Sequence, residues 1–185
     1  MPSDRSISNL SLTGFMGVGK STLGRHLANS LRYKFVDTDE LIEHRAGKTI
    51  TEIFETEGEA HFRQLEHQLV LEMATLKRMV ISTGGGLVTK NNNLETLKSY
   101  SFAVCLWASP ETIYQRVKRQ QHRPLLQTEN PIETIRDLLA TRAPFYKQSD
   151  LLVHTDNRPL RVVAQLVSRH FFQALSKGNQ PKTGN

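Results

Sequence analysis

Several features that would place a chain outside the ordinary globular proteins are missing or scarce here. A single cysteine, Cys105, excludes an internal disulfide and is typical of proteins from a reducing cytoplasm. No apolar run approaches the roughly 18 residues of a transmembrane helix, so we expect no membrane-spanning segment. The first eight residues include Asp4 and Arg5 and lack the hydrophobic stretch of a secretory signal. We therefore expect a cytoplasmic protein without a membrane partner.

The composition favours one folded domain. Hydrophobic residues make up 38% of the 185 residues and charged residues 23%, which excludes a chain that is disordered throughout. A chain of this length buries a core without the help of disulfides or a structural metal. We expect one domain over residues 1–176, followed by a disordered tail at residues 177–185, where apolar anchors are missing.

The formal net charge of +6 suits both nucleic acids and small anions as partners. The distribution of the charges is more informative. Nine of the 18 acidic residues lie between Asp37 and Glu66, an arrangement unlike that of a protein that follows a phosphate backbone. The basic segment 116–123 has no aromatic side chain, whereas proteins that bind single strands interleave aromatic rings with cations. The sequence therefore favours a small anionic ligand and no nucleic acid.

Short apolar runs alternate with helical patterns along the chain. Strands are expected at residues 7–13, 35–37, 79–83, 102–107 and 151–154. Helices are expected at residues 20–31, 39–46, 50–54, 59–76, 110–118, 132–146 and 159–175. Thr49, with Glu52 three residues later, has the pattern of a capping box for the third of these helices. Alternation of strands and helices predicts an α/β fold with a parallel sheet.

The strongest motif is Gly-Phe-Met-Gly-Val-Gly-Lys-Ser-Thr at residues 14–22. It matches the phosphate-loop pattern G-x-x-x-x-G-K-[ST], with an apolar run before it and a helical pattern after it. Its glycines permit close approach of the backbone, whose amides then face a polyphosphate at the start of the helix. We expect Lys20 to reach the β- and γ-phosphates and the Ser21 hydroxyl to bind Mg²⁺. The nucleotide contacts predicted from this motif are Gly17, Val18, Gly19, Lys20, Ser21 and Thr22.

A phosphate loop does not by itself separate a kinase from an ATPase or a nucleotide-regulated switch. Many proteins of this kind place a metal-binding aspartate at the end of another strand, but the strand at 79–83 ends without a carboxylate. Asp37 and Asp39 follow the strand at 35–37 and, at strand spacing, point to the same side. We interpret Asp37 as a ligand of Mg²⁺ through water, and Asp39 as the group that orients or deprotonates an acceptor hydroxyl. The alternative role of Asp39 is to cap the following helix.

Together with further motifs, these residues resemble the shikimate kinase family. The motifs, which extend in order over about residues 9–175, are the phosphate loop, Asp37-Thr-Asp39, Phe62-Arg63-x-x-Glu66, Gly84-Gly-Gly86, Arg123-Pro-Leu-Leu126 and Arg142-Ala-Pro-Phe-Tyr146. The resemblance implies a P-loop kinase fold, related to the nucleoside monophosphate kinases, with three layers, α/β/α, around a central five-stranded parallel sheet. It also implies a reaction, in which ATP phosphorylates the 3-hydroxyl of shikimate in the route to chorismate and the aromatic amino acids.

The same resemblance implies a substrate-binding region at about residues 38–66, with further contacts later in the chain. The substrate-binding residues that it implies are Asp39, Phe54, Phe62, Arg63, Gly84, Gly85, Gly86 and Arg142. Arginine forks bind a carboxylate well, and Glu66 is expected to hold one of the two arginines in place. Each residue also has a purely structural explanation, such as core packing for the phenylalanines or a surface ion pair for Arg63 and Glu66.

Residues 116–127 are polar and basic, and the resemblance implies that they form a mobile lid. Arg123 matches the lid arginine that reaches the transferring phosphoryl group, so it joins Lys20 and Asp39 as a predicted catalytic residue. Arg116 and Arg158 match residues that flank the adenine ring. The alternative for the whole segment is an ordinary solvated basic loop.

Two other functions stay open on the sequence alone. The first is another small-molecule kinase of the same architecture, such as a gluconate or nucleoside monophosphate kinase. The second is a nucleotide-gated module that binds nucleic acid, which the positive charge permits. For the favoured interpretation we expect a monomer that uses ATP, shikimate and one Mg²⁺ ion.

Overall fold

The centre of the structure is a five-stranded sheet in which all neighbouring strands are parallel. A computed structural model describes residues 5–90, 92–118 and 128–178. Within these residues the strand order is β2-β3-β1-β4-β5. The strands are β1 (Asn9–Thr13), β2 (Lys34–Asp37), β3 (Met79–Ser82), β4 (Ser101–Trp107) and β5 (Leu151–His154).

Helices connect successive strands and cover the sheet. They are α1 (Lys20–Leu31), α2 (Thr38–Ala46), α3 (Ile50–Thr56), α4 (Gly58–Met73), α5 (Asn93–Tyr100), α6 (Pro110–Val117), α7 (Pro131–Tyr146) and α8 (Leu160–Gly178), with a 3-10 turn η1 at Leu87–Thr89. Helices α1 and α8 pack together on the sheet, whereas α5 packs on β4 and against α4. Right-handed crossovers between parallel strands place these two groups on opposite faces. The predicted three-layer α/β/α architecture is therefore confirmed.

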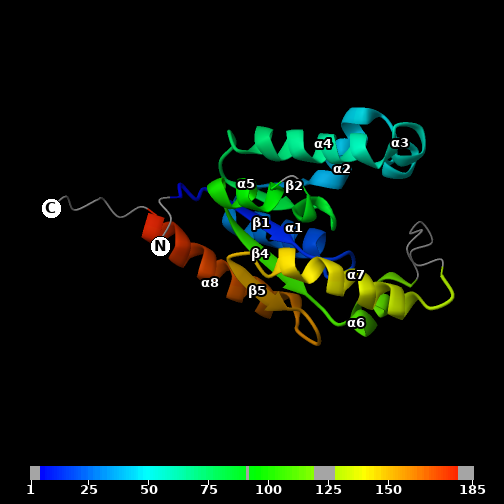
Figure 1. Cartoon of the computed structure of the whole chain (residues 1–185). Helices are drawn as coiled ribbons and strands as arrows, with labels where there is room; N and C mark the ends of the chain where they lie inside the picture. The colour runs from blue at the N-terminus through cyan, green and yellow to red at the C-terminus, as the bar shows by residue number, and fades with distance from the viewer. Residues whose placement is uncertain (1–4, 91, 119–127, 179–185) are drawn as a thin grey trace.

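The segments that flank the strand ends project to either side of the sheet. In Figure 1 the α2–α4 segment lies at the top of the view and α6–α7 at the lower right, with the sheet between them. Because all strands are parallel, their carboxyl ends lie along one edge. Ligands of open α/β sheets bind at that edge, where connections diverge to the two faces.

Local sequence signals explain where several helices begin. The Thr49 hydroxyl accepts a hydrogen bond from the Glu52 amide while the Glu52 carboxylate accepts one from the Thr49 amide, so the predicted capping box is present. Pro110 and Pro131 stand in the first turns of α6 and α7, where a missing N–H costs nothing. Gly47 ends α2 at a φ of 65°, a conformation that favours glycine.

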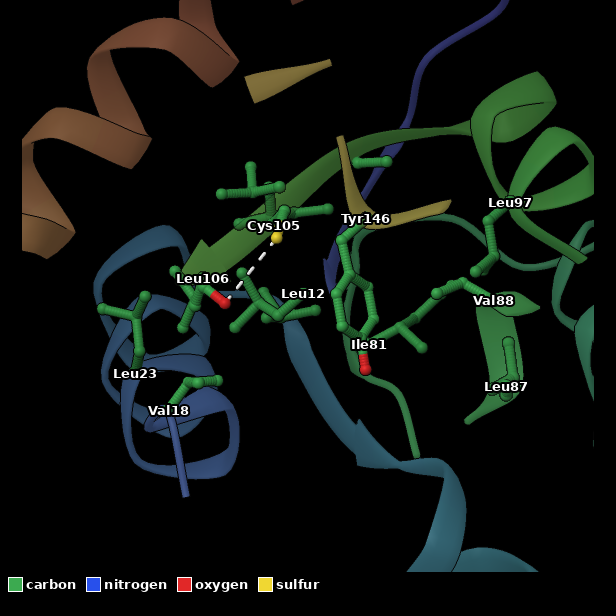
Figure 2. Packing of buried hydrophobic residues seen from close by; sticks show 14 of the residues in the cluster. Leu12, Val18, Leu23, Ile81, Leu87, Val88, Leu97, Cys105, Leu106 and Tyr146 are labelled. Atoms are coloured by element: carbon green, nitrogen blue, oxygen red, sulfur yellow. Dashed lines mark hydrogen bonds between the residues drawn. The ribbon is translucent and has the colours of Figure 1, made fainter. Parts of the chain in front are cut away.

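The core lies on both faces of the central strands. Every residue of β1 is buried, and so are the first six residues of β4, as expected for parallel strands covered on two sides. Figure 2 shows part of this core, in which Leu12, Cys105 and Leu106 of the sheet lie near Val18 and Leu23 from the phosphate loop and α1. The lone thiol of Cys105 is therefore a core group, and burial raises its pKa to about 12.

The sequence prediction missed one helix and placed several helix ends differently; the helix expected at 59–76, for example, ends at Met73. Helix α5 was not expected, although Leu94, Leu97 and Tyr100 fall on one buried face of it. Helix α8 continues to Gly178, two residues beyond the expected end of the domain at residue 176. The rest of the expected tail lies outside the described residues. None of the helices in the described part of the chain is long and apolar enough to cross a membrane.

Candidate active site

A cleft of about 820 Å³ runs along the carboxyl edge of the sheet. Its walls come from the segments that follow β1, β2, β3 and β5, together with residues of α4, α6 and α7. The predicted site residues that line it are Gly17, Val18, Gly19, Lys20, Ser21, Thr22, Asp37, Asp39, Phe62, Arg63, Gly84, Gly85, Gly86, Arg116, Arg142 and Arg158. Phe54 is not part of the lining, and Arg123 lies outside the described residues.

The phosphate loop joins β1 to α1 through backbone conformations that require glycine. Gly17 and Gly19 have φ values of 73° and 102°. A Cβ on Gly14 would meet the Leu106 carbonyl oxygen at 2.3 Å, so this position admits no side chain. Helix α1 starts at Lys20 without a side-chain cap, so its first amides are available to bind an anion.

Lys20 lies inside the curve of this loop. Its ammonium donates hydrogen bonds to the carbonyl oxygens of Gly14 and Phe15, each at 2.8 Å, and only 9% of the residue is exposed. These bonds fix the positive charge within the ring of backbone amides. The position is suited to a polyphosphate that rests on the loop.

Ser21 and Asp37 form the adjoining part of the cleft. The Ser21 hydroxyl donates to Asp37 Oδ2 at 2.7 Å, and the Ser82 hydroxyl lies 3.4 Å from Ser21 Oγ. Asp37, and not Asp39, caps α2, because Asp37 Oδ1 accepts a hydrogen bond from the Asp39 amide at 3.2 Å. The capping alternative for Asp39 is therefore wrong, and so is the assumption of strand spacing, since Asp39 belongs to the first turn of α2.

The wall of the cleft opposite the phosphate loop is formed by the carboxylates of Asp39 and Glu66 and the guanidinium of Arg63. Arg63 donates to Glu66 at 2.7 Å and to Glu59 at 2.9 Å, and Glu66 is only 1% exposed. A Cβ on Gly84 would lie 2.4 Å from Asp39 Oδ1 and 3.1 Å from Glu66 Oε1. The glycine is thus needed because both carboxylates pack directly on its backbone.

Arg142 and Phe62 complete this wall. The Arg142 guanidinium lies over the Phe15 ring at 5.4 Å and 3.7 Å from the position of a Cβ on Gly85. Phe62 is buried and packs at 5.0 Å on the ring of Phe54. Phe54 is 36% exposed and supports Phe62 from outside the cleft.

Glu66 is an acid of the site whose pKa is strongly perturbed. Desolvation by burial raises its pKa to about 7, and the neighbouring charge of Asp39 acts in the same direction. Hydrogen bonding to Arg63 and the positive charges of Arg63 and Arg142 oppose this rise. Perturbed acids of this kind concentrate in functional clefts.

At the far end of the cleft, Arg116 connects the phosphate loop to the residue that follows β5. Its guanidinium donates to the Thr155 carbonyl oxygen at 2.8 Å, to the Thr155 hydroxyl at 3.0 Å and to the Val18 carbonyl oxygen at 3.2 Å. Arg158 lies nearby in the same lining. Of the expected lid at residues 116–127, only 116–118 belong to the described part of the chain.

Several lining residues escaped the sequence analysis. Ser82 ends β3 and Thr83 follows it, Thr155 follows β5, and Leu160 and Val163 lie at the start of α8. Three of these five lie at the carboxyl ends of strands, where a parallel sheet exposes residues to the ligand cleft. That rule applied to each predicted strand end would have selected Ser82, Thr83 and Thr155.

A phosphate loop on a doubly wound parallel sheet, with charged and polar side chains across the cleft, is typical of P-loop kinases of small molecules. The sequence model of the shikimate kinase family matches residues 16–171. A shikimate kinase of Pseudomonas aeruginosa is 46% identical over 158 residues, which cover 85% of this chain and 92% of that protein. One from Caldanaerobacter subterraneus is 40% identical, with 90% and 98% covered. The chain belongs to the shikimate kinase family.

Solved structures agree with this assignment. A shikimate kinase from Acinetobacter baumannii in complex with shikimate superposes with a TM-score of 0.85 at 40% identity, and 91% of this chain and 95% of that chain are covered. A gluconokinase from Sinorhizobium meliloti reaches a TM-score of 0.61 at 16% identity, with 94% and 96% covered. The second likeness concerns the fold alone.

The perturbed pKa of Glu66 predicts how stability depends on pH. The folded chain keeps a proton on Glu66 that the unfolded chain loses between about pH 4.5 and pH 7. The stability that comes from the protonated group is therefore present below pH 4.5 and lost as the pH rises towards 7. Relative to Glu66→Gln, the free energy of unfolding of the unaltered chain should fall over this window by up to about 3 kcal/mol.

Denaturant unfolding at a series of pH values measures this difference. Glu59→Gln is the matched control, because Glu59 also pairs with Arg63 but is 58% exposed. This variant keeps Glu66, so its stability should fall with pH as that of the unaltered chain does. Parallel stability curves for the unaltered chain and Glu66→Gln would contradict the prediction.

Gly84→Ala should displace the Asp39 carboxylate, because its new Cβ would lie 2.4 Å from Asp39 Oδ1. The backbone of Gly84 is outside the left-handed region, so the strain arises from this contact and not from the main chain. Where a carboxylate acts on the reacting atoms, as predicted for Asp39, a displacement of about 1 Å lowers turnover by roughly 100-fold. Steady-state kinase assays should show this fall in kcat with an unchanged KM for the nucleotide. An unaltered kcat would show that the carboxylate is not needed where it lies.

Proposed function

We propose that this chain transfers the γ-phosphoryl group of ATP to the 3-hydroxyl of shikimate and yields ADP and shikimate 3-phosphate, an intermediate of aromatic amino acid biosynthesis. The observation that carries this proposal is the division of one cleft into two chemically different halves. The phosphate loop with Lys20 forms one half. Arg63 and Arg142, which suit a carboxylate, form the other together with Asp39.

In this proposal the substrate half binds the acid by its carboxylate. Arg63 and Arg142 supply the two guanidinium groups, and each is held by a neighbour: Arg63 by Glu66 and Arg142 by the face of Phe15. The backbone of Gly84–Gly86 is proposed to lie along the ring of shikimate. Side chains at positions 84 and 86 would displace Asp39 and Arg63 from this half of the cleft. Phe62 provides the apolar wall, and Phe54 backs it.

Asp39 is proposed to act on the reacting hydroxyl. Its carboxylate lies beside Gly84 and lines the cleft. It orients the 3-hydroxyl and accepts its proton as the oxygen forms a bond to the γ-phosphorus and the bond to the β-phosphate oxygen breaks. The proton stays on Asp39 until product leaves, and ADP carries the released electron pair.

The nucleotide half is proposed to hold ATP through the amides of residues 17–22. Lys20 is placed to neutralise charge on the β- and γ-phosphates, and Arg116 and Arg158 flank the adenine end of the cleft. Arg123, assigned from the family resemblance, is proposed to reach the transferring phosphoryl group.

One Mg²⁺ ion fits beside the loop. Ser21 Oγ and Asp37 Oδ2 are 2.7 Å apart and offer the oxygen ligands that Mg²⁺ prefers. We propose that these two residues hold it, Asp37 through water. Such an ion neutralises the charge of the phosphates.

We further propose that the protein acts as a monomer in the cytoplasm. Each half of the cleft is built from residues of one chain, and the free thiol of Cys105 suits a reducing compartment.

A coupled ADP-release assay with shikimate, gluconate and nucleoside monophosphates side by side tests the function. Shikimate alone should give sustained turnover, and Lys20→Ala should abolish most of it while the circular dichroism spectrum stays unchanged. Turnover of gluconate or a nucleotide without turnover of shikimate would favour another small-molecule kinase. Salt-dependent binding of oligonucleotides without any turnover would favour a nucleic-acid-binding module.

Asp39→Asn tests the role of the carboxylate. The amide is nearly isosteric but accepts no proton at neutral pH, so kcat should fall by roughly 10²–10⁴-fold with a smaller change in KM for shikimate. Steady-state kinetics at saturating ATP measure both constants. A normal kcat would leave Asp39 with a binding role only.

A further inference from the structure

Tyr146 ends the last of the sequence motifs and has no role in the mechanism above. It is the final residue of α7 and is completely buried. Figure 2 shows its ring among the buried side chains Ile81, Val88 and Leu97. From this position the phenol hydroxyl donates a hydrogen bond to the Gly85 carbonyl oxygen at 2.5 Å, across 61 positions of sequence.

This bond connects α7 to the middle residue of Gly84–Gly86, the glycine segment in the substrate half of the cleft. The carbonyl oxygens of Gly84 and Gly86 accept hydrogen bonds from the amides of Leu87 and Thr89, within the turn that follows. Gly85 instead receives its bond from a distant helix. The orientation of the Gly85 peptide therefore depends on where α7 places Tyr146.

The same helix carries Arg142, four residues before Tyr146 and hence on the same face. The Arg142 guanidinium lies 3.7 Å from the position of a Cβ on Gly85, so both side chains converge on one peptide. Between them, Pro144 stands inside α7 and removes one backbone hydrogen bond from its last turn. Side-chain contacts, not the helix ladder alone, fix the geometry there.

The hydroxyl keeps its proton over the working range of pH. Burial raises the pKa of Tyr146 to about 12, although the charge of Arg142 and hydrogen bonding to it act in the opposite direction. Tyr146 thus acts as a donor to Gly85, with Arg142 close enough to share its environment.

We propose that Tyr146 is a positioning residue for recognition of the substrate's carboxylate. Its hydroxyl fixes the Gly85 peptide and, through the shared helix face, sets Arg142 in the orientation that receives the acid. This inference rests on the proposed function, because it concerns the same acid-binding half of the cleft.

Tyr146→Phe removes the hydroxyl and retains the ring, so the fold should persist. Loss of one buried donor next to the binding groups should raise KM for shikimate roughly ten-fold. The KM for ATP and kcat should stay within about two-fold, because the phosphate loop and Asp39 are untouched.

Tyr100→Phe is a matched control, because it also removes a hydrogen bond from a buried tyrosine hydroxyl to a backbone carbonyl oxygen. Tyr100 is also buried, and its hydroxyl donates to the Val70 carbonyl oxygen at 2.8 Å, outside the residues that line the cleft. Both variants should lower the melting temperature, but Tyr100→Phe should leave KM for shikimate unchanged. An equal rise of KM in both would overturn the proposal, since it would show a general effect of lost stability.

Two further measurements test whether Tyr146 acts through Arg142. The neutral carboxamide of shikimate, used as a competitive inhibitor, should bind to Tyr146→Phe and to the unaltered chain with equal Ki. Tyr146→Phe should add no further rise in KM to that of Arg142→Ala. A parallel loss for the carboxamide, additive effects, or an unchanged KM in Tyr146→Phe would each overturn the proposal. An unaltered chain without shikimate turnover would overturn the proposed function as well, which separates the two failures.

Discussion

The parallel direction of the five strands is the constraint on which the rest of the molecule depends. It brings every strand's carboxyl end to one edge, so the phosphate loop, the Asp37–Asp39 turn and the glycine segment meet although long stretches of chain separate them. Each of these segments is anchored by its strand, and β1 and β4 are buried on both faces. The cleft thus inherits its rigidity from the sheet.

Charge balance gives the substrate half its particular character. Asp39 and Glu66 lie close to the backbone of Gly84, whereas Arg142 and Arg63 lie against the next two glycines, Gly85 and Gly86. Removing these groups from water is costly, and the pKa of Glu66 records that cost. Glycine at positions 84 and 86 is what permits such dense packing of charged groups, since a methyl group would occupy the space of a carboxylate or a guanidinium.

The sequence predicted those elements that depend on residues close together in the chain. The phosphate loop, the capping box at Thr49 and the strands follow from spacing and residue type, and the structure agrees with them. Asp39 was placed in the cleft for an incorrect reason, because a cap by Asp37 starts the helix one residue earlier than strand spacing assumes. The bond from Tyr146 to Gly85 was beyond prediction, since no local pattern reports a contact between residues 61 positions apart. The roles of Lys20, Ser21, Asp37 and Asp39 were predicted from the phosphate-loop motif and from carboxylate chemistry. The roles of the other side chains in the cleft, such as Arg63 and Arg142, came from family resemblance.

Trp107 gives the molecule an internal optical probe. It is the single tryptophan of the chain and ends β4, with its ring 6.5 Å from that of Tyr146 in an edge-to-face arrangement. Its fluorescence therefore reports on the packing beneath the glycine segment without competing signals from other indoles. Changes in the packing of Tyr146 can therefore be followed by emission from the native chain, free of any attached dye.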